Sequence, residues 1–332
     1  MKKLEIAVLG DGGWGTTLAI LLHKKGFKVC LWGAFSGYVS VLRSQRVNAR
    51  FLPKVKIPLG LEITDNLAHA ILGKELVVIA VPSQYLRQVL KKAKQLNYPR
   101  QAIWLTVVKG IEVGSLKRMS EIVKEELGNI EVAVLSGPTI AHEVALGIPT
   151  TAVVASPNVN LRKKLQDIFT TENFRIYTNS DVCGVELGGS LKNVIAIACG
   201  ISDGLGFGAN TKAALLARGL AEISRLGKVM GAKPATFSGI SGLGDLVTTC
   251  ISSYSRNRLV GEQIGKGKKL KQVVSHTKMI AEGVPTAKSA YQLSRRLKVN
   301  MPIVKEVYNV LYKNKSSLKA VKDLMTRQKK EE

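Results

Sequence analysis

The chain has few residues of the kinds that form cross-links or bind metals. Only four of its 332 residues are cysteines and four are histidines. No two cysteines show a C-x-x-C spacing, and the scattered histidines lack ligand spacing with nearby acids. We therefore expect neither disulfides nor a metal site. The residues concerned are Cys30, Cys183, Cys199 and Cys250, with His23, His69, His142 and His276.

Long hydrophobic runs are lacking as well. No stretch reaches the length of a membrane-spanning helix without a charged or turn-forming residue. The N-terminal Met-Lys-Lys leads into an alternating strand pattern, not into the hydrophobic segment of a secretory signal. We expect a protein without a membrane span that is located in the cytoplasm.

Acidic residues are scarce relative to basic ones. The chain has 49 Lys and Arg against 24 Asp and Glu, a net charge of +25. Such a charge suits nucleic acid, an anionic membrane surface or anionic small molecules. The basic residues are spread through segments such as 91–94, 162–164 and 266–269, without an aromatic-interleaved RNA motif or a helix-turn-helix. We interpret them as solvated surfaces that also steer phosphorylated ligands, and we expect no nucleic acid partner.

The most informative feature that is present is a glycine-rich turn between a strand and a helix. A strand at residues 4–9 leads into Gly10-Asp-Gly-Gly-Trp-Gly15 and then into an apolar helix. Gly10 permits a tight turn, Gly12 lets backbone N–H groups approach a pyrophosphate, and Gly15 lets the helix pack close to the strand. A second strand at residues 28–32 completes a β-α-β unit, so the pattern indicates a dinucleotide-binding site.

The residues after the second strand leave the identity of the dinucleotide open. An acid at this point binds a ribose 2′-hydroxyl, and an Arg favours a 2′-phosphate. The segment 33–36 contains neither, although Arg43, Arg46 and Arg50 follow shortly. The sequence therefore permits NADP and does not exclude NAD.

Further apolar runs predict a doubly wound, largely parallel sheet. Runs that are apolar on both faces are typical of buried parallel strands, and the loops at their carboxyl ends line the ligand crevice. These runs lie at residues 76–81, 103–108, 132–135 and 151–155, and their loops contain residues 82–83, 109–110 and 136–139.

The pattern changes after residues 174–177, where long helical periods replace the short runs. We therefore predict an α/β fold, with a Rossmann-type doubly wound domain at residues 1–180 and an all-helical domain at residues 181–332. The predicted helices span residues 182–199, 211–230, 257–266, 284–296 and 303–310.

Two polar residues, Lys192 and Asn193, interrupt an otherwise apolar helix. A buried Lys is rare unless it is paired, and desolvation lowers its pKa so that it can exchange a proton near neutral pH. The alternative is a surface lysine on an amphipathic helix. The small residues on both sides favour the catalytic interpretation.

Three other positions suit the binding of an anionic substrate, and each has a structural alternative. Lys109 ends a central strand, where an ammonium can meet a phosphate or a carbonyl oxygen or can be an ordinary strand-end charge. Asp245 lies in a Gly-rich turn at a helix start and can be a helix cap. The segment 255–258, Ser-Arg-Asn-Arg, suits bidentate phosphate binding or a solvated helix start.

Together these segments resemble the bacterial NAD(P)-dependent glycerol-3-phosphate dehydrogenases, nearly end to end. The matching segments stand in the same order, at residues 10–19, 48–53, 81–83, 109–110, 136–139, 187–196, 203–210, 218–222, 242–245, 255–258 and 282–283.

The resemblance implies an oxidoreductase that reversibly reduces dihydroxyacetone phosphate to sn-glycerol 3-phosphate, a phospholipid precursor. It implies that Lys192 is the acid/base, oriented by Asp245 and Asn193, and that the protein is a homodimer. The implied substrate ligands are Lys109, Gly137, Thr139, Lys192, Asp245, Ser255, Arg256 and Asn257. The implied cofactor contacts are Gly10, Gly12, Gly13, Trp14, Gly15, Ala34, Arg50, Lys109, Ala141, Arg256, Ile280 and Glu282.

The loop after the second strand departs from the family pattern. Relatives commonly carry a basic or other polar residue where this chain has Ala34 and Phe35. We predict that NADPH is favoured, with Arg50 or a neighbouring base as the partner of the 2′-phosphate.

Two other functions fit part of the pattern. A 3-hydroxyacid or 6-phosphogluconate-type dehydrogenase shares the Rossmann domain, the helical domain and a lysine on the first long helix. The net charge also fits a nucleic-acid-binding protein that has kept a Rossmann scaffold without activity.

Overall fold

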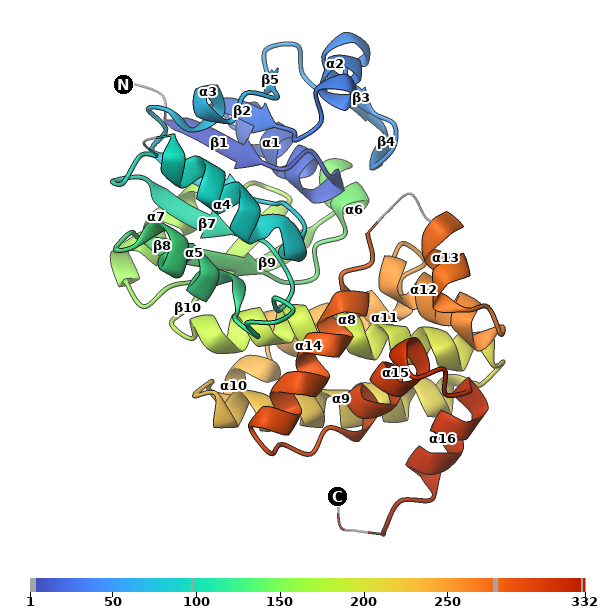
Figure 1. The fold of residues 1–332 in the computed structure, drawn as a ribbon. Coiled ribbons are helices and arrows are strands. Elements are labelled where there is room, and N and C mark those ends of the chain that lie inside the picture. Colours follow the sequence, from blue (N-terminus) through green and yellow to red (C-terminus); the bar gives the residue numbers. More distant parts are fainter. Residues whose placement is uncertain (1–3, 97, 277–279, 330, 332) are drawn as a thin grey trace. The chain divides into compact units, whose positions relative to one another are not determined.

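The computed structural model describes residues 4–96, 98–276, 280–329 and 331 (Figure 1). The chain packs as two compact units. The first comprises the chain up to Lys109 together with Lys117–Glu186, and the second comprises Gly110–Leu116 together with the chain from Leu187 onwards. The boundary that we predict between residues 180 and 181 stays a prediction. It does not anticipate that residues 110–116 pack with the helical unit.

The first unit contains an eight-stranded sheet in its described residues, with the strand order β10-β9-β8-β7-β6-β1-β2-β5. Adjacent strands run parallel except at the antiparallel pair of β8 and β9. The strands are β1 (Glu5–Leu9), β2 (Lys28–Trp32), β5 (Glu62–Thr64), β6 (Leu76–Ile79), β7 (Ile103–Thr106), β8 (Val132–Ser136), β9 (Thr150–Ala155) and β10 (Phe174–Asn179). A separate antiparallel ribbon consists of β3 (Val47–Asn48) and β4 (Leu52–Lys56).

Helices cover both faces of this sheet. Because side chains alternate along a strand, Ile6 and Val8 pack into one core, and Ala7 and Leu9 pack into the other. The first core receives α1 (Gly13–Lys24), α2 (Ser36–Gln45) and α7 (Val159–Phe169). The second receives α3 (Leu67–Ile71), α4 (Leu86–Gln95) and α5 (Met119–Leu127). The predicted doubly wound architecture is confirmed.

The second unit is helical, as predicted (Figure 1). Its helices are α8 (Val182–Gly204), which begins in the first unit, α9 (Ala209–Val229), α10 (Pro234–Phe237), α11 (Asp245–Ile251), α12 (Arg256–Gly265), α13 (Leu270–His276), α14 (Gly283–Arg296), α15 (Pro302–Tyr312) and α16 (Ser317–Met325). Within the described residues, α8 alone is long and apolar enough to cross a membrane, and 83% of that stretch is buried inside the protein. This burial is typical of a core helix.

Glycines allow α8 and α12 to approach each other very closely. A Cβ at Gly200 would lie 2.0 Å from the carbonyl oxygen of Arg258, and a Cβ at Gly204 would lie 2.2 Å from that of Glu262. In the opposite direction, a Cβ at Gly261 would lie 2.1 Å from the carbonyl oxygen of Ile197, and a Cβ at Gly265 would lie 2.4 Å from that of Ile201. The two helix backbones are therefore in direct contact, which fixes α12 against the helix that carries Lys192.

Candidate functional site

The candidate cofactor site of the first unit is the glycine turn between β1 and α1. Gly10 has a φ of 124°, and a Cβ there would lie 2.6 Å from the carbonyl oxygen of Ala80. A Cβ at Gly15 would lie 1.9 Å from the carbonyl oxygen of Gly10. Neither position has room for a side chain, so the turn is tight and α1 starts directly against it.

The start of α1 suits an anion. Gly12 precedes the helix in an extended conformation, and no side chain caps the helix among the described residues. A Cβ at Gly12 would meet no atom within 4 Å, whereas a Cβ at Gly13 would lie 2.6 Å from the carbonyl oxygen of Phe51. The backbone therefore leaves open space at Gly12, as a dinucleotide pyrophosphate requires.

The buried side chain of Asn48 holds this turn in place. Its Nδ2 donates to the carbonyl oxygen of Asp11 at 2.8 Å and to Oγ1 of Thr16 at 2.7 Å. Its Oδ1 accepts from the hydroxyl of Tyr38 at 2.7 Å and from the backbone N–H of Phe51 at 3.2 Å. Sequence reasoning assigned no role to Asn48, because a single amide in a short strand carries no pattern.

The structure places an acid from the glycine turn beside the end of β2. The sequence places no acid at residues 33–36, yet the carboxyl group of Asp11 lies against Gly33, where a Cβ would be 2.4 Å from Oδ2. This Oδ2 is buried and has no hydrogen-bond partner among the described residues. Burial raises the pKa of Asp11, opposed by a backbone hydrogen bond and by the charge of Arg50. A carboxyl group therefore does lie next to the segment that follows β2.

Arg43 and Arg46, which follow this segment, bind backbone carbonyl oxygens. Arg43 Nε donates to the carbonyl oxygen of Ile63 at 2.8 Å, and Arg46 Nη1 donates to that of Leu61 at 2.8 Å. Arg50 is exposed, and its guanidinium carbon lies 5.0 Å from the ring centroid of Phe51.

Three other predicted cofactor contacts of the first unit are Ala34, Ala141 and Trp14. Ala34 is exposed, and the carbonyl oxygen of Ala141 accepts from Thr17 Oγ1 at 3.0 Å. Trp14 packs edge-to-face against Phe174, with 6.2 Å between ring centroids.

Lys109 and the loop after β8 come together in the first unit. Lys109 Nζ donates to the carbonyl oxygen of Gly137 at 2.8 Å and to Oγ1 of Thr139 at 3.2 Å. Gly137 has a φ of 146°, and a Cβ there would lie 2.9 Å from Cα of Ala152. The backbone conformation therefore aims a carbonyl at the ammonium, and three of the predicted substrate ligands form one cluster.

The second unit contains a buried polar cluster centred on Lys192 in α8. Lys192 is 5% exposed and Asp245 is 1% exposed. The ammonium forms an ion pair with Asp245 and donates to Oγ1 of Thr249 at 2.6 Å. Asp245 and Thr249 stand four residues apart on α11, so both face α8. The predicted lysine is buried and paired, and Thr249 is a partner that sequence reasoning missed.

Asn193 lies in a separate amide network. Its Oδ1 accepts from Asn257 Nδ2 at 2.8 Å, and Oδ1 of Asn257 accepts from the backbone N–H of Gly283 at 2.9 Å. This network ties α8, α12 and the start of α14 together. The predicted role of Asn193 in orienting Lys192 stays a prediction.

The segment 255–258 begins α12. Ser255 Oγ caps the helix by accepting from the backbone N–H of Arg258 at 3.3 Å. Arg258 Nε forms an ion pair with Asp203 at 2.7 Å. The two guanidinium groups that the sequence suggests for phosphate binding therefore have different surroundings. Arg256 is exposed and attracted by Glu282, and Ile280 is also exposed.

The glycine turn in a doubly wound sheet, followed by a helical unit with a buried Lys–Asp pair, defines a nicotinamide-dependent dehydrogenase. Family models agree with this class. The N-terminal model of NAD-dependent glycerol-3-phosphate dehydrogenase matches residues 5–162, and the C-terminal model matches residues 181–322. The chain belongs to the family of NAD-dependent glycerol-3-phosphate dehydrogenases.

Individual relatives match over nearly the whole chain. The glycerol-3-phosphate dehydrogenase of Citrifermentans bemidjiense, NAD(P)+-dependent by name, is 50% identical over 331 residues, covering 99% of this chain and 98% of the relative. The enzyme of the same name from Thermoanaerobacter is 51% identical over 329 residues, with 99% of each chain covered. The crystal structure of glycerol-3-phosphate dehydrogenase from Coxiella burnetii has a TM-score of 0.95 at 39% identity, covering 98% of this chain and 99% of that one.

Proposed function

We propose that this chain catalyses the reversible reduction of dihydroxyacetone phosphate to sn-glycerol 3-phosphate with NAD(P)H. The observation that carries the proposal is the buried Lys192–Asp245 pair with Thr249, in a chain of this family. Reduction of a ketone builds negative charge on its oxygen, and a positioned ammonium both stabilises that charge and supplies the proton. Lys192 is the proton donor in this direction and the acceptor in reverse.

Asp245 and Thr249 position this ammonium. A buried cation requires an opposite charge, because an unpaired ion in the protein interior loses its hydration without compensation. Asp245 supplies that charge, and the hydroxyl of Thr249 accepts a second hydrogen bond from the ammonium. The two contacts therefore leave the amine in one orientation, which a proton transfer to a single oxygen needs.

The further substrate ligands that we propose fall into two groups, each of which is described within its own unit. In the first unit these are Lys109, Gly137 and Thr139, whose cluster presents a fixed ammonium. In the second they are Ser255, Arg256 and Asn257, at the N-terminus of a ten-residue helix. A phosphate dianion is stabilised by guanidinium groups and by the N–H groups of a helix start.

The residues of the glycine turn fit a dinucleotide. Gly10 and Gly15 make the turn possible, and Gly12 leaves its backbone accessible. When bound, the nicotinamide supplies the hydride. The further contacts proposed for the cofactor are Gly13, Trp14, Ala34, Arg50, Lys109, Ala141, Arg256, Ile280 and Glu282.

The central test compares NADPH oxidation by the wild type and by Lys192→Ala with dihydroxyacetone phosphate as substrate. We expect the variant to lose roughly 10²- to 10⁴-fold or more in kcat, the usual contribution of a general acid. Lys228→Ala, at an exposed position of α9, is the matched control and keeps the wild-type rate. Wild-type activity with a sugar acid but not with dihydroxyacetone phosphate would reject the substrate. A Lys192→Ala rate within tenfold of the wild type would reject the role of Lys192.

We propose that NADPH is favoured over NADH through Arg50. Arg50 is the candidate because it is exposed and its charge acts on Asp11, the acid of the glycine turn. Arg50→Ala then lowers kcat/KM for NADPH and leaves kcat/KM for NADH unchanged. Equal or better efficiency of the wild type with NADH would instead favour Asp11, the buried acid beside Gly33, as the group that selects the ribose.

We also propose that the protein acts as a cytoplasmic homodimer, that it binds no nucleic acid, and that its product feeds phospholipid synthesis. Size-exclusion chromatography with light scattering distinguishes a dimer of 35.9 kDa chains from a monomer. A monomer of full activity would reject the dimer, and retention of RNA at moderate salt would reject the absence of nucleic acid binding.

A further inference from the structure

A second group of reactive side chains lies in the first unit, and the proposed reaction does not use it. The thiol of Cys30, the carboxylate of Glu62 and a ring nitrogen of His69 all lie within 4.8 Å of one another. A thiol, an imidazole and a carboxylate are the three kinds of side chain that bind zinc in proteins. The cluster therefore combines the right ligand types at nearly the right separation.

The fold itself brings these residues together. Cys30 and Glu62 are paired in register on the parallel strands β2 and β5, so they point to the same face of the sheet. His69 lies on α3, whose start is fixed because the side chain of Asn66 accepts from the backbone N–H of His69 at 3.0 Å. The ring Nε2 of His69 is hydrogen-bonded to Oε1 of Glu62. Three elements thus supply one ligand each.

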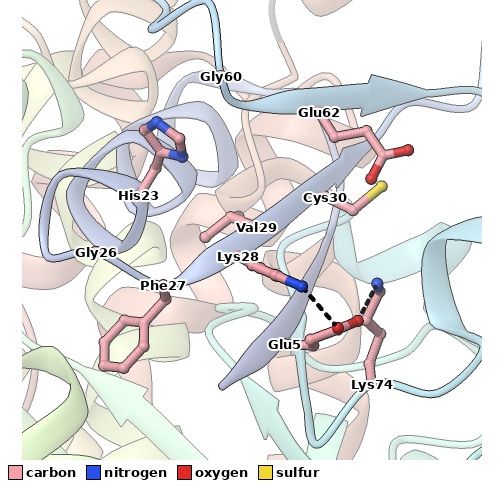
Figure 2. A pocket seen from close by; sticks show the side chains of 10 residues that line it. All are labelled: Glu5, His23, Gly26, Phe27, Lys28, Val29, Cys30, Gly60, Glu62 and Lys74. Atoms are coloured by element: carbon pink, nitrogen blue, oxygen red, sulfur yellow. Dashed lines mark hydrogen bonds and ion pairs between the residues drawn. The ribbon is translucent and has the colours of Figure 1, made fainter. Parts of the chain in front are cut away.

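Two of these residues, Cys30 and Glu62, line a cavity of about 520 Å³ in the first unit (Figure 2). Figure 2 shows the sulfur of Cys30 turned toward the carboxylate of Glu62. Cys30 itself is 1% exposed, whereas the side chains of Glu62 and His69 reach solvent. On the same wall, Glu5 pairs with Lys74 at 3.1 Å and with Lys28 at 3.5 Å. These lysines are balanced by Glu5, whereas the carboxylate of Glu62 is paired with the ring of His69.

We propose that Cys30, Glu62 and His69 form a three-ligand binding site for zinc, with the fourth coordination position open to water. Around a tetrahedral zinc, with bonds of about 2.0–2.3 Å, ligand atoms stand roughly 3.3–3.7 Å apart. All three ligand atoms lie within 4.8 Å of one another, and Nε2 of His69 is hydrogen-bonded to Oε1 of Glu62, so the ion has to replace that hydrogen bond. The two exposed side chains can rotate to do so while the strand holds Cys30. Calcium and magnesium prefer oxygen ligands and do not fit this set.

Cys30 has to lose its thiol proton to bind the ion, because the thiolate is the form that ligates a metal. A zinc ion attracts the thiolate and releases its proton. Because β5 is the edge strand of the sheet, the bound ion would clamp this edge to β2 and α3.

The test is a titration of the purified full-length protein with Co²⁺, whose tetrahedral thiolate complexes have characteristic absorption, followed by displacement with Zn²⁺. We expect one equivalent to give the sulfur-to-cobalt band in the wild type and no such band in Cys30→Ser. His69→Gln and Glu62→Gln change exposed side chains and should weaken binding by at least roughly 10- to 100-fold. Cys183→Ser, which removes a thiol elsewhere in the first unit, is the matched control and should bind as the wild type does.

Three results would overturn the proposal. The first is a wild type without the thiolate band at stoichiometric Co²⁺. The second is a band that persists in Cys30→Ser, and the third is equal weakening in Cys183→Ser and His69→Gln. Thermal unfolding gives an independent readout, because saturating Zn²⁺ should raise the Tm of the wild type and not that of His69→Gln.

Discussion

Glu222 is a buried carboxyl group that caps a helix. It is 1% exposed and accepts hydrogen bonds from the backbone N–H groups of Ile303, at 2.7 Å, and Val304, at 3.2 Å, at the start of α15. Burial raises its pKa to about 7, opposed by these hydrogen bonds and by the charges of Arg225 and Arg327. The group is therefore expected to make stability depend on pH.

The sign of this dependence follows from the raised pKa. Between the usual value of 4.5 and the folded value of about 7, the folded chain binds more protons than the unfolded chain. Stability from this group is fully present below pH 4.5 and is lost as pH rises through 7, by roughly 3 kcal/mol. Glu222→Gln cannot ionise, so its free energy of unfolding in urea should lack this decline between pH 5 and pH 8. Glu172→Gln, at an exposed position, should keep it, and an unchanged decline in Glu222→Gln would contradict the assignment.

Thr249 allows a second test at the scale of one residue. Its hydroxyl accepts from the ammonium of Lys192 at 2.6 Å, and a hydrogen bond to a charged group contributes about 1.5–3 kcal/mol. Thr249→Val should lower kcat by about tenfold or more, because the ammonium loses one of its fixed directions. Thr249→Ser keeps the hydroxyl and should restore most of the rate. Equal losses in both variants would point to packing and not to positioning.

At the scale of elements, the contact of α8 with α12 is sensitive to single atoms. Gly200→Ala would place a methyl group 2.0 Å from the carbonyl oxygen of Arg258, so the helices must separate at a cost of about 1–3 kcal/mol or more. We expect a lower Tm and a lower kcat, because Asn257 on α12 bonds to Asn193 on α8. Gly37→Ala is the control. Gly37 is a helical glycine at which an added Cβ would meet no atom within 4 Å. This substitution should stabilise the chain slightly.

The elements that could be predicted from sequence are those with a strong hydrophobic period. The runs at 28–32 and 103–108 contain β2 and β7, and the long helical pattern at 182–199 lies within α8. The three residues of β5 and the two of β3 are too short to show a period. Their places depend on pairing with distant strands, which local sequence does not encode.

Some residues of the candidate site could be predicted from the sequence, and others could not. Lys192 is a polar residue in an apolar helix, and the glycines stand at fixed spacing, so both are visible in sequence. The placing of Thr249 opposite Lys192 depends on the packing of α11 against α8. Likewise, Cys30 meets Glu62 through a strand register, and residues that are thirty or more positions apart show no metal-ligand spacing.

At the scale of the whole molecule, the net charge of +25 should act on the rate of substrate capture. The Debye length shortens from about 30 Å at 0.01 M salt to about 8 Å at 0.15 M. We expect kcat/KM for dihydroxyacetone phosphate to fall severalfold over this range while kcat changes little. A neutral osmolyte at equal osmolality is the control. A kcat/KM independent of salt would show that the surface charge does not steer this substrate.

The glycine contact of α8 and α12 has a consequence for the gene. Every single-nucleotide missense change of a glycine codon adds at least a Cβ atom. At Gly200, Gly204, Gly261 and Gly265 that atom would lie within 2.4 Å of a backbone oxygen. These four codons can therefore accept synonymous changes but not missense changes. Missense variants should be depleted there in a saturation library selected for growth.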